Sequence, residues 1–354
     1  MRILRVLIGT AALFATTAPG AAASRADWDA CKGDDPDRSI AACTRIIQGR
    51  GETAKDSAIA RGYRGLAYQR KGDLDRAIAD YDEAIRLDPK HAEAYYGRGL
   101  TYRNKGDLER AIADYSEAIR LDPKLAAAYN NRGNAYQDKD DLDRAIADFN
   151  EAIRLAPQFE AVYPDTIIRR LAHFNRGGAY ADKGDLDRAI ADFNEAIRLD
   201  PKSADAYYNR GLAHLYGGDL AKALADVSEA SELDPQDAYK ALWADIVAQR
   251  NNAPSRLSQA SMRIDMTPWP APIVRSFLGR MPPEAVLAAA DDPDAKKKKN
   301  QVCEANFYGG ELALRLNAKD EAVRLFRLAA NGCAKDVNEW FAANAELKAL
   351  GETP

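Results

Sequence analysis

The chain has 354 residues and a formal net charge of −4. This length allows more than one domain or an elongated array of small units. The acidic balance argues against nucleic acid or an anionic membrane surface as the partner. Beyond the N-terminal segment, no run of about 18 apolar residues predicts a transmembrane helix.

Residues 1–23 are predicted to be a secretory signal peptide. Two arginines stand near the start, an apolar stretch covers 6–15, and an A-x-A pattern ends at Ala23, so we expect cleavage before Ser24. A membrane anchor is the alternative, but the apolar stretch is too short to span a bilayer. The protein is therefore expected to be periplasmic or secreted.

Residues 24–56 are predicted to form an N-terminal cap. The four cysteines lie near the two ends of the chain, at Cys31, Cys43, Cys303 and Cys333. An even number of cysteines in an exported protein favours disulfides, and we expect the pairs Cys31–Cys43 and Cys303–Cys333. Reactive thiols or a metal site are disfavoured, because the chain has no CxxC and neither pair has a histidine nearby. No metal ion or other cofactor is expected.

A similar segment recurs five times between residues 57 and 236, at 57–90, 91–124, 125–158, 169–202 and 203–236. In the second copy, Gly99 and Tyr102 fall on one helical face, Gly106 breaks the helix, and Asp107 can cap the next one. Pro123 ends that second helix, since proline disfavours helix in the residue before it. Each segment is therefore predicted to be a helix, a short turn and a second helix.

This pattern resembles the tetratricopeptide repeat (TPR) family, whose sequence period is about 34 residues. The matching positions are Gly99, Tyr102, Ala111, Tyr115, Ala118 and Pro123 in the second copy, with counterparts at the same spacing in the first, third and fourth. The fifth copy departs at His214 and Val227. The resemblance implies an all-α TPR solenoid of about five repeats, and it makes residues 24–56 a degenerate repeat.

An insertion at 159–168 separates the third and fourth copies, so these two copies are spaced further apart than any other neighbouring pair. We expect it to lengthen the first helix of the fourth repeat at its N-terminus, after a short loop. A tolerated surface insertion is the favoured interpretation. The alternative is a dimer or partner contact, because Phe159 and Tyr163 are apolar for an exposed loop.

The sequence changes character after the last repeat. A helix at 237–253 is predicted to cover the array, and a connector at 254–300 contains a Pro-Trp cluster in which Trp269 is a candidate dimer or partner contact. Residues 301–354 are predicted to be a helical, TPR-like module. Its first two helices have the helix-turn-helix pattern without the motif residues of the repeats.

The last third also resembles the NlpI-like periplasmic TPR lipoproteins, in the order WPAPIVRSFLG, CEANFYGGELALRLNAKDEAVRLFRLAA and EWFAANAELKALG. That resemblance implies an adaptor that dimerises and brings cell-wall endopeptidases to a periplasmic protease. This chain lacks the lipobox cysteine of those proteins, so no lipid anchor is expected.

No pattern in the sequence indicates an active site, so no catalytic residue is assigned and the protein is not expected to be an enzyme. His173 and His214 occupy repeat positions that are otherwise mostly aromatic. The chain has no G-x-S-x-G and no Gly-rich phosphate loop. Recurring aspartates are expected to cap helices, or to pair with the recurring arginines, as in Asp114 with Arg98, Asp148 with Arg132 and Asp192 with Arg176.

A binding groove is the expected site, because a stacked array presents the first helix of each unit on a concave surface. By the family resemblance, the residues that face it are Tyr96, Arg103, Asn130, Asn131, Asn134, Asn175, Tyr208 and Asn209. Asparagine donates and accepts hydrogen bonds, which suits a peptide backbone. Solvated asparagines without a function are an equally weighted alternative for each residue.

The function expected from the sequence is a non-catalytic periplasmic scaffold or adaptor that binds proteins or peptides. The residues also allow a structural scaffold of the cell envelope that associates with itself, as a homodimer. A hydrolase is the least favoured alternative.

Overall fold

The computed structural model describes residues 23–49, 52–156, 165–334 and 338–353. The predicted signal peptide, apart from Ala23, lies outside the described residues, and so do Phe159 and Tyr163. The chain divides into two compact units, one ending at Pro123 and the other beginning at Lys124.

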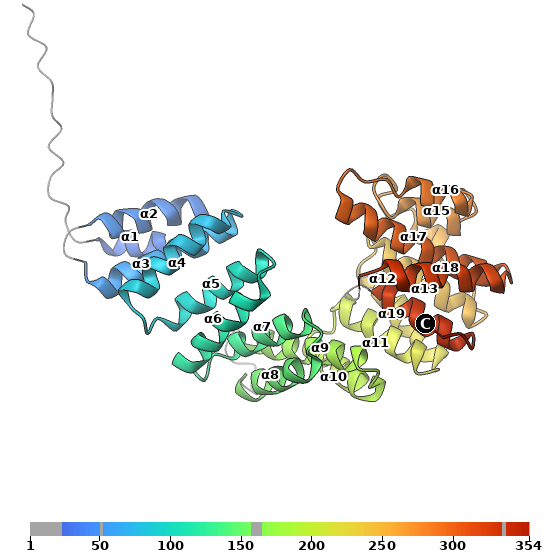
Figure 1. Ribbon diagram of the computed structural model, residues 1–354, viewed down its shortest axis with the longest axis horizontal. Coiled ribbons are helices and arrows are strands. Elements are labelled where there is room, and N and C mark those ends of the chain that lie inside the picture. The colour runs from blue at the N-terminus through green and yellow to red at the C-terminus, as the bar shows by residue number, and fades with distance from the viewer. Residues whose placement is uncertain (1–22, 50–51, 157–164, 335–337, 354) are drawn as a thin grey trace, which may run out of the picture. The chain divides into compact units, whose positions relative to one another are not determined.

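The first unit is a series of antiparallel helix pairs (Figure 1). Its helices are α1 (Arg25–Cys31), α2 (Pro36–Gln48), α3 (Ala54–Arg70), α4 (Leu74–Leu87), α5 (Ala92–Asn104) and α6 (Leu108–Leu121). Helices α3 and α4 pack as one hairpin, and α5 and α6 as the next. The sequence therefore folds here into the stacked pairs that its period predicts.

The second unit continues with hairpins and ends in a larger helical module. The hairpins and the helix that covers them are α7 (Ala126–Gln137), α8 (Leu142–Leu155), α9 (Asp165–Asp182), α10 (Leu186–Leu199), α11 (Ala204–Tyr216), α12 (Leu220–Leu233) and α13 (Ala238–Arg250). The module comprises α14 (Leu257–Ala260), α15 (Ala271–Phe277), α16 (Pro283–Ala289), α17 (Ala295–Arg315), α18 (Lys319–Gly332) and α19 (Asn338–Ala349). The main core of this unit is centred on Trp243 of α13 and Phe307 of α17, whose rings stack with centroids 5.6 Å apart.

The second helix of each repeat begins at an aspartate whose carboxylate accepts a hydrogen bond from the backbone N–H three residues later. These N-caps are Asp73, Asp107, Asp141, Asp185 and Asp219. The preceding residue has a positive φ, which glycine adopts most easily; it is Gly106 in the second repeat and Asp140, with φ 61°, in the third. The predicted role of the recurring aspartates as caps is confirmed.

Each hairpin is closed by a large side chain of the second helix, which packs over a glycine of the first. A Cβ added to Gly133 would lie 2.7 Å from the ring of Phe149, and one added to Gly99 would lie 2.8 Å from Tyr115. The rings themselves are fully buried, and each contributes about 1.5–3 kcal/mol of burial free energy. Glycine is therefore needed for the close approach of the two helices.

Helix α9 has 18 residues, whereas its counterpart α11 has 13. The extra residues are at its N-terminal end, because the two helices end at equivalent turns before Asp185 and Asp219. The expected lengthening of the fourth repeat's first helix is confirmed. The rest of the insertion lies outside the described residues.

The hairpin of α17 and α18 corrects one expectation, namely that this pair lacks the motif residues. Gly310 receives the ring of Phe326, at the sequence spacing that the glycine and the large residue have in the repeats, with a would-be Cβ 2.6 Å from the ring. Ala322 and Ala329 are buried at the spacing of the two recurring alanines in each second helix. The pair is therefore packed like a repeat. The sequence hides this, because neither the arginine before the glycine nor the Asp-Pro ending is present.

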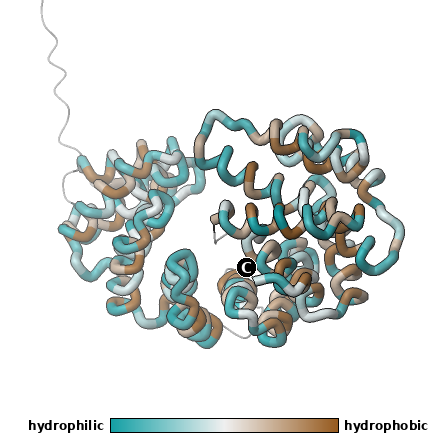
Figure 2. Tube along the Cα trace, turned by 45° about the vertical axis from the view of Figure 1, so that its right-hand side comes forward, coloured by the Kyte–Doolittle hydropathy of each residue, from teal (hydrophilic) through white to brown (hydrophobic). Residues whose placement is uncertain are grey.

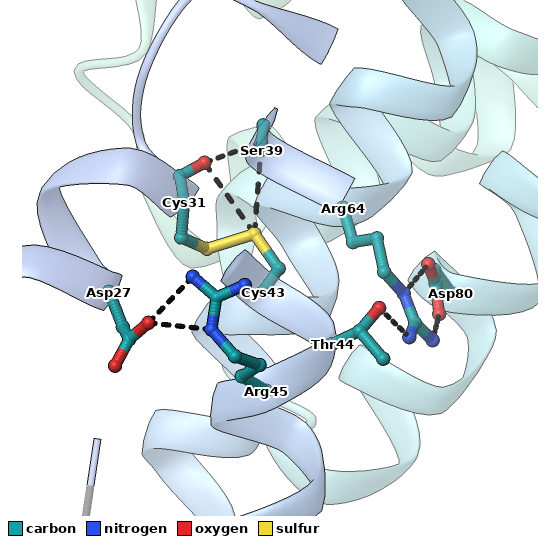
Figure 3. The surroundings of a disulfide bond; sticks show 8 residues. All are labelled: Asp27, Cys31, Ser39, Cys43, Thr44, Arg45, Arg64 and Asp80. Carbon is teal, nitrogen blue, oxygen red and sulfur yellow. Dashed lines mark hydrogen bonds and ion pairs between the residues drawn. A yellow bond between two sulfur atoms is a disulfide. The ribbon is translucent and has the colours of Figure 1, made fainter. Parts of the chain in front are cut away.

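The cysteines form the two disulfides that were expected from the sequence. Cys31–Cys43 joins α1 to α2, and Cys303–Cys333 joins α17 to the residue that ends α18. Figure 3 shows the first bridge, where the Ser39 hydroxyl donates to the backbone carbonyl of Cys31. Disulfides of this kind are typical of proteins from oxidising compartments.

Hydrophobic and hydrophilic residues alternate along the helices, as Figure 2 shows by colour. This is the pattern of helices that bury one face. Among the described residues, no helix combines the length and the hydropathy needed to cross a bilayer.

Candidate protein-interaction surface

A bidentate ion pair joins the two helices of every repeat. The pairs are Arg64–Asp80, Arg98–Asp114, Arg132–Asp148, Arg176–Asp192 and Arg210–Asp226. The arginine lies just before the glycine of the first helix, and the aspartate just before the large residue of the second. The three pairings predicted from the sequence are confirmed.

Several of these arginines also reach the second helix of the preceding repeat. Arg210 donates to Asn194 at 2.6 Å, and Arg98 donates to Asp82 at 2.5 Å. Figure 3 shows the equivalent contact of Arg64 with Thr44 of α2. Each such arginine therefore lies on a first helix and binds two second helices, that of its own repeat and that of the preceding one. These contacts fix the orientation of the first helix.

Asp192 carries an additional hydrogen bond from a histidine. Nδ1 of His173 lies 2.8 Å from the carboxylate, and both side chains are buried. Burial works to raise the pKa of Asp192, but the hydrogen bonds from Arg176 and His173 outweigh it and hold the pKa below its ordinary value. His173 is buried, as expected of a packing residue, and its hydrogen bond to Asp192 was not predicted.

The first helices α7 and α9 contact each other along a row of polar side chains. Nδ2 of Asn175 donates to Oδ1 of Asn130 at 3.1 Å. Two turns further along, Nε2 of Gln137 donates to Asp182 at 2.7 Å. Gly178 lies beside this second bond, where an added Cβ would be 3.5 Å from Nε2 of Gln137.

We call this region the α7–α9 surface and define it by Asn131, Asn134, Gln137, Asn175, Gly178 and Asp182. All six residues are partly exposed. Burial raises the pKa of Asp182, and the hydrogen bond from Gln137 only partly offsets this effect. The surface therefore presents amides together with one carboxyl group in a partly desolvated setting.

The structure places the eight groove candidates in three different situations. Asn130 and Tyr208 are buried, with 3% and 8% of their surface exposed, so little of either could touch a ligand. Tyr96 and Arg103 are partly exposed on α5 of the first unit. The remaining four candidates lie partly exposed in the second unit: Asn131, Asn134, Asn175 and Asn209.

Three residues of the α7–α9 surface were not predicted, namely Gly178, Gln137 and Asp182. Gly178 directly follows Gly177. Gln137 and Asp182 stand four and five residues after Gly133 and Gly177, and the family resemblance points to the groove at all three positions. The pairing of Gln137 with Asp182 is not visible in the sequence. The insertion sets them 45 residues apart, and their contact follows only from the packing of α9 on α7.

Trp269, the candidate dimer contact, is partly buried against the core of the second unit. Its indole Nε1 donates to Glu304 of α17 at 2.7 Å, and the Tyr239 hydroxyl donates to the same carboxylate at 2.6 Å. A partner could therefore meet only the exposed part of this indole. The other two candidates for such a contact, Phe159 and Tyr163, lie outside the described residues.

Buried carboxyl groups gather in the C-terminal module. Burial, together with the charge of Glu304, raises the pKa of Glu339 to about 7. Arg250 of α13 binds both Glu311 and Glu346 across the core. These carboxyl groups are bound by other side chains of the same chain. The described residues hold no cluster of side chains able to bind a metal ion.

Comparison with known proteins agrees with this architecture. Family models described as tetratricopeptide repeat match residues 63–126, 126–159 and 204–237, and one described as TPR repeat matches 177–217. No curated protein matches the chain.

Solved structures share the helical architecture. The structure of pilF from Pseudomonas aeruginosa is 18% identical to this chain, with a TM-score of 0.52, over 64% of this chain and 98% of that one. The type IV pilus biogenesis factor PilW is 20% identical with a TM-score of 0.50, over 58% of this chain and 89% of that one. Both likenesses concern the fold alone. The resemblance of the last third to NlpI-like proteins stays a prediction.

Proposed function

Because the chain is a tetratricopeptide repeat protein, and such repeats are scaffolds for protein–protein interaction, we propose that it binds protein or peptide partners on the α7–α9 surface. The polar row between α7 and α9 supports this assignment. Asparagine and glutamine amides donate and accept hydrogen bonds, as the backbone of an extended peptide does. Asp182 adds an acceptor for a backbone N–H or a cationic side chain.

The pairings along this row support a prearranged site. The Asn130–Asn175 bond orients the Asn175 amide, and the Gln137–Asp182 bond fixes two side chains that would otherwise rotate freely. Side chains that are held before binding lose less conformational entropy when a ligand arrives. Buried Asn130 is thus a positioning residue, whereas Asn131 and Asn134 are the candidates for direct contact.

An exported setting is the second part of the proposal. The signal-like sequence at 1–23 and the two disulfides support a periplasmic or secreted protein. The resemblance of the last third to NlpI-like adaptors supports cell-wall hydrolases and a protease as the partner class. In that role the protein would bring two proteins together without catalysing a reaction itself.

A pull-down from envelope extract of the source organism tests the proposal. The wild-type protein is compared with the triple variant Asn131→Ala/Asn134→Ala/Gln137→Ala and with the matched control Asn331→Ala, which removes an exposed amide from α18. We expect the triple variant to lose its partners about tenfold and the control to keep them. If all three proteins recovered the same amount of partner proteins and had unchanged melting temperatures, the proposal would be wrong.

A further inference from the structure

A cleft of about 760 Å³ lies in the second unit, between α12, α13 and α14. Helix α13 begins at Ala238, one repeat length after α11 begins at Ala204, so it stands in the register of a sixth first helix. In each repeat the first helix packs against a second helix of 14 residues, as α11 packs on α12. The helix that follows α13 directly is α14, which has only four residues. The cleft is therefore the place where the structure has no full-length second helix.

The side chains that α13 presents to this cleft differ in size and charge from those at the equivalent positions of a repeat. In the fifth repeat, Gly211 is flanked by Tyr207 and Arg210. The large side chain of the second helix packs over the glycine, and the arginine binds its aspartate. At the equivalent positions α13 has Asp245 in place of the glycine, with Ala241 and Ala244 around it. In α13, two small side chains flank an acidic residue. In the fifth repeat, a large and a basic side chain flank a glycine.

Asp245 is buried with only 2% of its surface exposed. Arg315 donates a hydrogen bond to Oδ2 at 3.4 Å and forms an ion pair with it, whereas the buried Oδ1 has no hydrogen-bond donor among the described residues. Burial raises the pKa of Asp245, and the nearby Ser255 hydroxyl and Arg315 only partly offset this effect. A buried acceptor without a donor destabilises the protein, so a ligand that donates a hydrogen bond to Oδ1 would gain binding free energy here.

The opposite walls are mostly small or apolar. Helix α12 contributes Leu224, Ala225 and Ser228, and α14 contributes Leu257 and Ala260. At the rim, Arg256 is engaged with Glu232 at 3.3 Å. Alanines and serines leave room for bulky side chains of a ligand, and they let a helix approach closely.

We propose that this cleft binds a helix of a partner protein, which lays bulky apolar side chains over the alanines and directs one lysine or arginine at Asp245. The buried carboxylate of Asp245 and the missing second helix favour this occupant over an acidic or an extended polar peptide, although Arg256 and Arg263 also line the cleft. The cleft is formed by different helices from the α7–α9 surface, so this proposal is independent of the binding proposed for that surface. The protein would then contact two partners, or one partner at two places.

Two synthetic helical peptides of about four turns test the proposal by fluorescence anisotropy with the full mature chain. Both carry the same leucine-rich face, and they differ only in a central lysine or glutamate. We expect the lysine peptide to bind about tenfold more tightly. Asp245→Asn should remove most of this preference, because it deletes the charge and keeps the shape.

Ala225→Leu provides an independent test, since it fills the cleft from the surface of α12 without touching the core. It should weaken the lysine peptide about tenfold, while Ala288→Leu, the same change on an exposed position of α16, should leave binding unchanged. Equal binding of both peptides to the wild type, or unaltered binding to Ala225→Leu, would overturn the proposal. A concentration-dependent dimer that Ala225→Leu abolishes would overturn it as well, because a second copy would then occupy the cleft.

Discussion

The carboxylate of Asp192 accepts two hydrogen bonds from Arg176 and one from Nδ1 of His173. A buried carboxylate needs such partners, because desolvation penalises its charged form. The equivalent aspartate of every repeat is buried in the same way. These ion pairs explain why an arginine and an aspartate recur with the period.

Asp192→Asn should destabilise the protein by about 2–3 kcal/mol at pH 7, because it leaves the partly buried Arg176 without a counter-charge. The folded-state pKa of Asp192 lies below the ordinary 3.8. Its stabilising effect is therefore present above that value and is lost as the pH falls through the folded-state pKa. Urea unfolding followed by circular dichroism at pH 7 and pH 3 measures both effects.

The control for this experiment is Asp187→Asn, which removes an exposed carboxylate from the first turn of the same helix. It should change stability by no more than about 0.5 kcal/mol. If Asp192→Asn destabilised the protein equally at pH 7 and pH 3, the loss would come from the altered hydrogen bonds of the amide and not from the lost charge.

At the scale of the helix pair, the structure shows what the sequence could and could not predict. The five hairpins, their aspartate caps and the long α9 follow from local residues and spacing, so all of them were predictable. The hairpin of α17 and α18 was only partly predictable, because its packing keeps the glycine and the aromatic ring but loses the arginine and the Asp-Pro ending.

The candidate site was less predictable than the fold. Position in the repeat predicted which residues face the groove. It could not indicate that neighbouring helices bury Asn130 and Tyr208, nor that Gln137 meets Asp182 across the insertion. The unpartnered Oδ1 of Asp245 could not be predicted for a similar reason, because it depends on the short α14 that follows α13.

Gly310→Ala tests whether α17 and α18 pack as a repeat. The new methyl group would lie 2.6 Å from the Phe326 ring, so the pair must move apart at a loss of about 1–3 kcal/mol. The neighbouring Gly309→Ala is the matched control, since its nearest contact is Leu325 at 3.4 Å. Because alanine favours helix, this control should be neutral or stabilise by up to about 1 kcal/mol.

Thermal unfolding of the two glycine variants decides the question. A lower melting temperature for Gly310→Ala alone supports repeat-like packing of the module. Equal melting temperatures for the two variants would show that the ring of Phe326 can move aside without loss, and that the likeness to a repeat is only one of spacing.

At the scale of the whole molecule, each compact unit has its own core and its own disulfide. Cys31–Cys43 lies in a small core with Ile46 and Ala60 in the first unit, and Cys303–Cys333 belongs to the large core of the second. A terminal hairpin has a neighbour on one side only, so it buries less surface than an internal one. A covalent link at that place offsets the deficit by restricting the unfolded chain.

The double variant Cys31→Ser/Cys43→Ser should therefore loosen one unit selectively. The lost restriction is worth about 3 kcal/mol for a short loop, and Ser39 and Ile46 would lie in a helix held by packing alone. Hydrogen exchange followed by mass spectrometry should show faster exchange in α1 to α3 and unchanged exchange in α17 and α18. Cys303→Ser/Cys333→Ser should give the reverse pattern. Faster exchange throughout the chain in either variant would contradict this, because it would mean that the two units unfold as one.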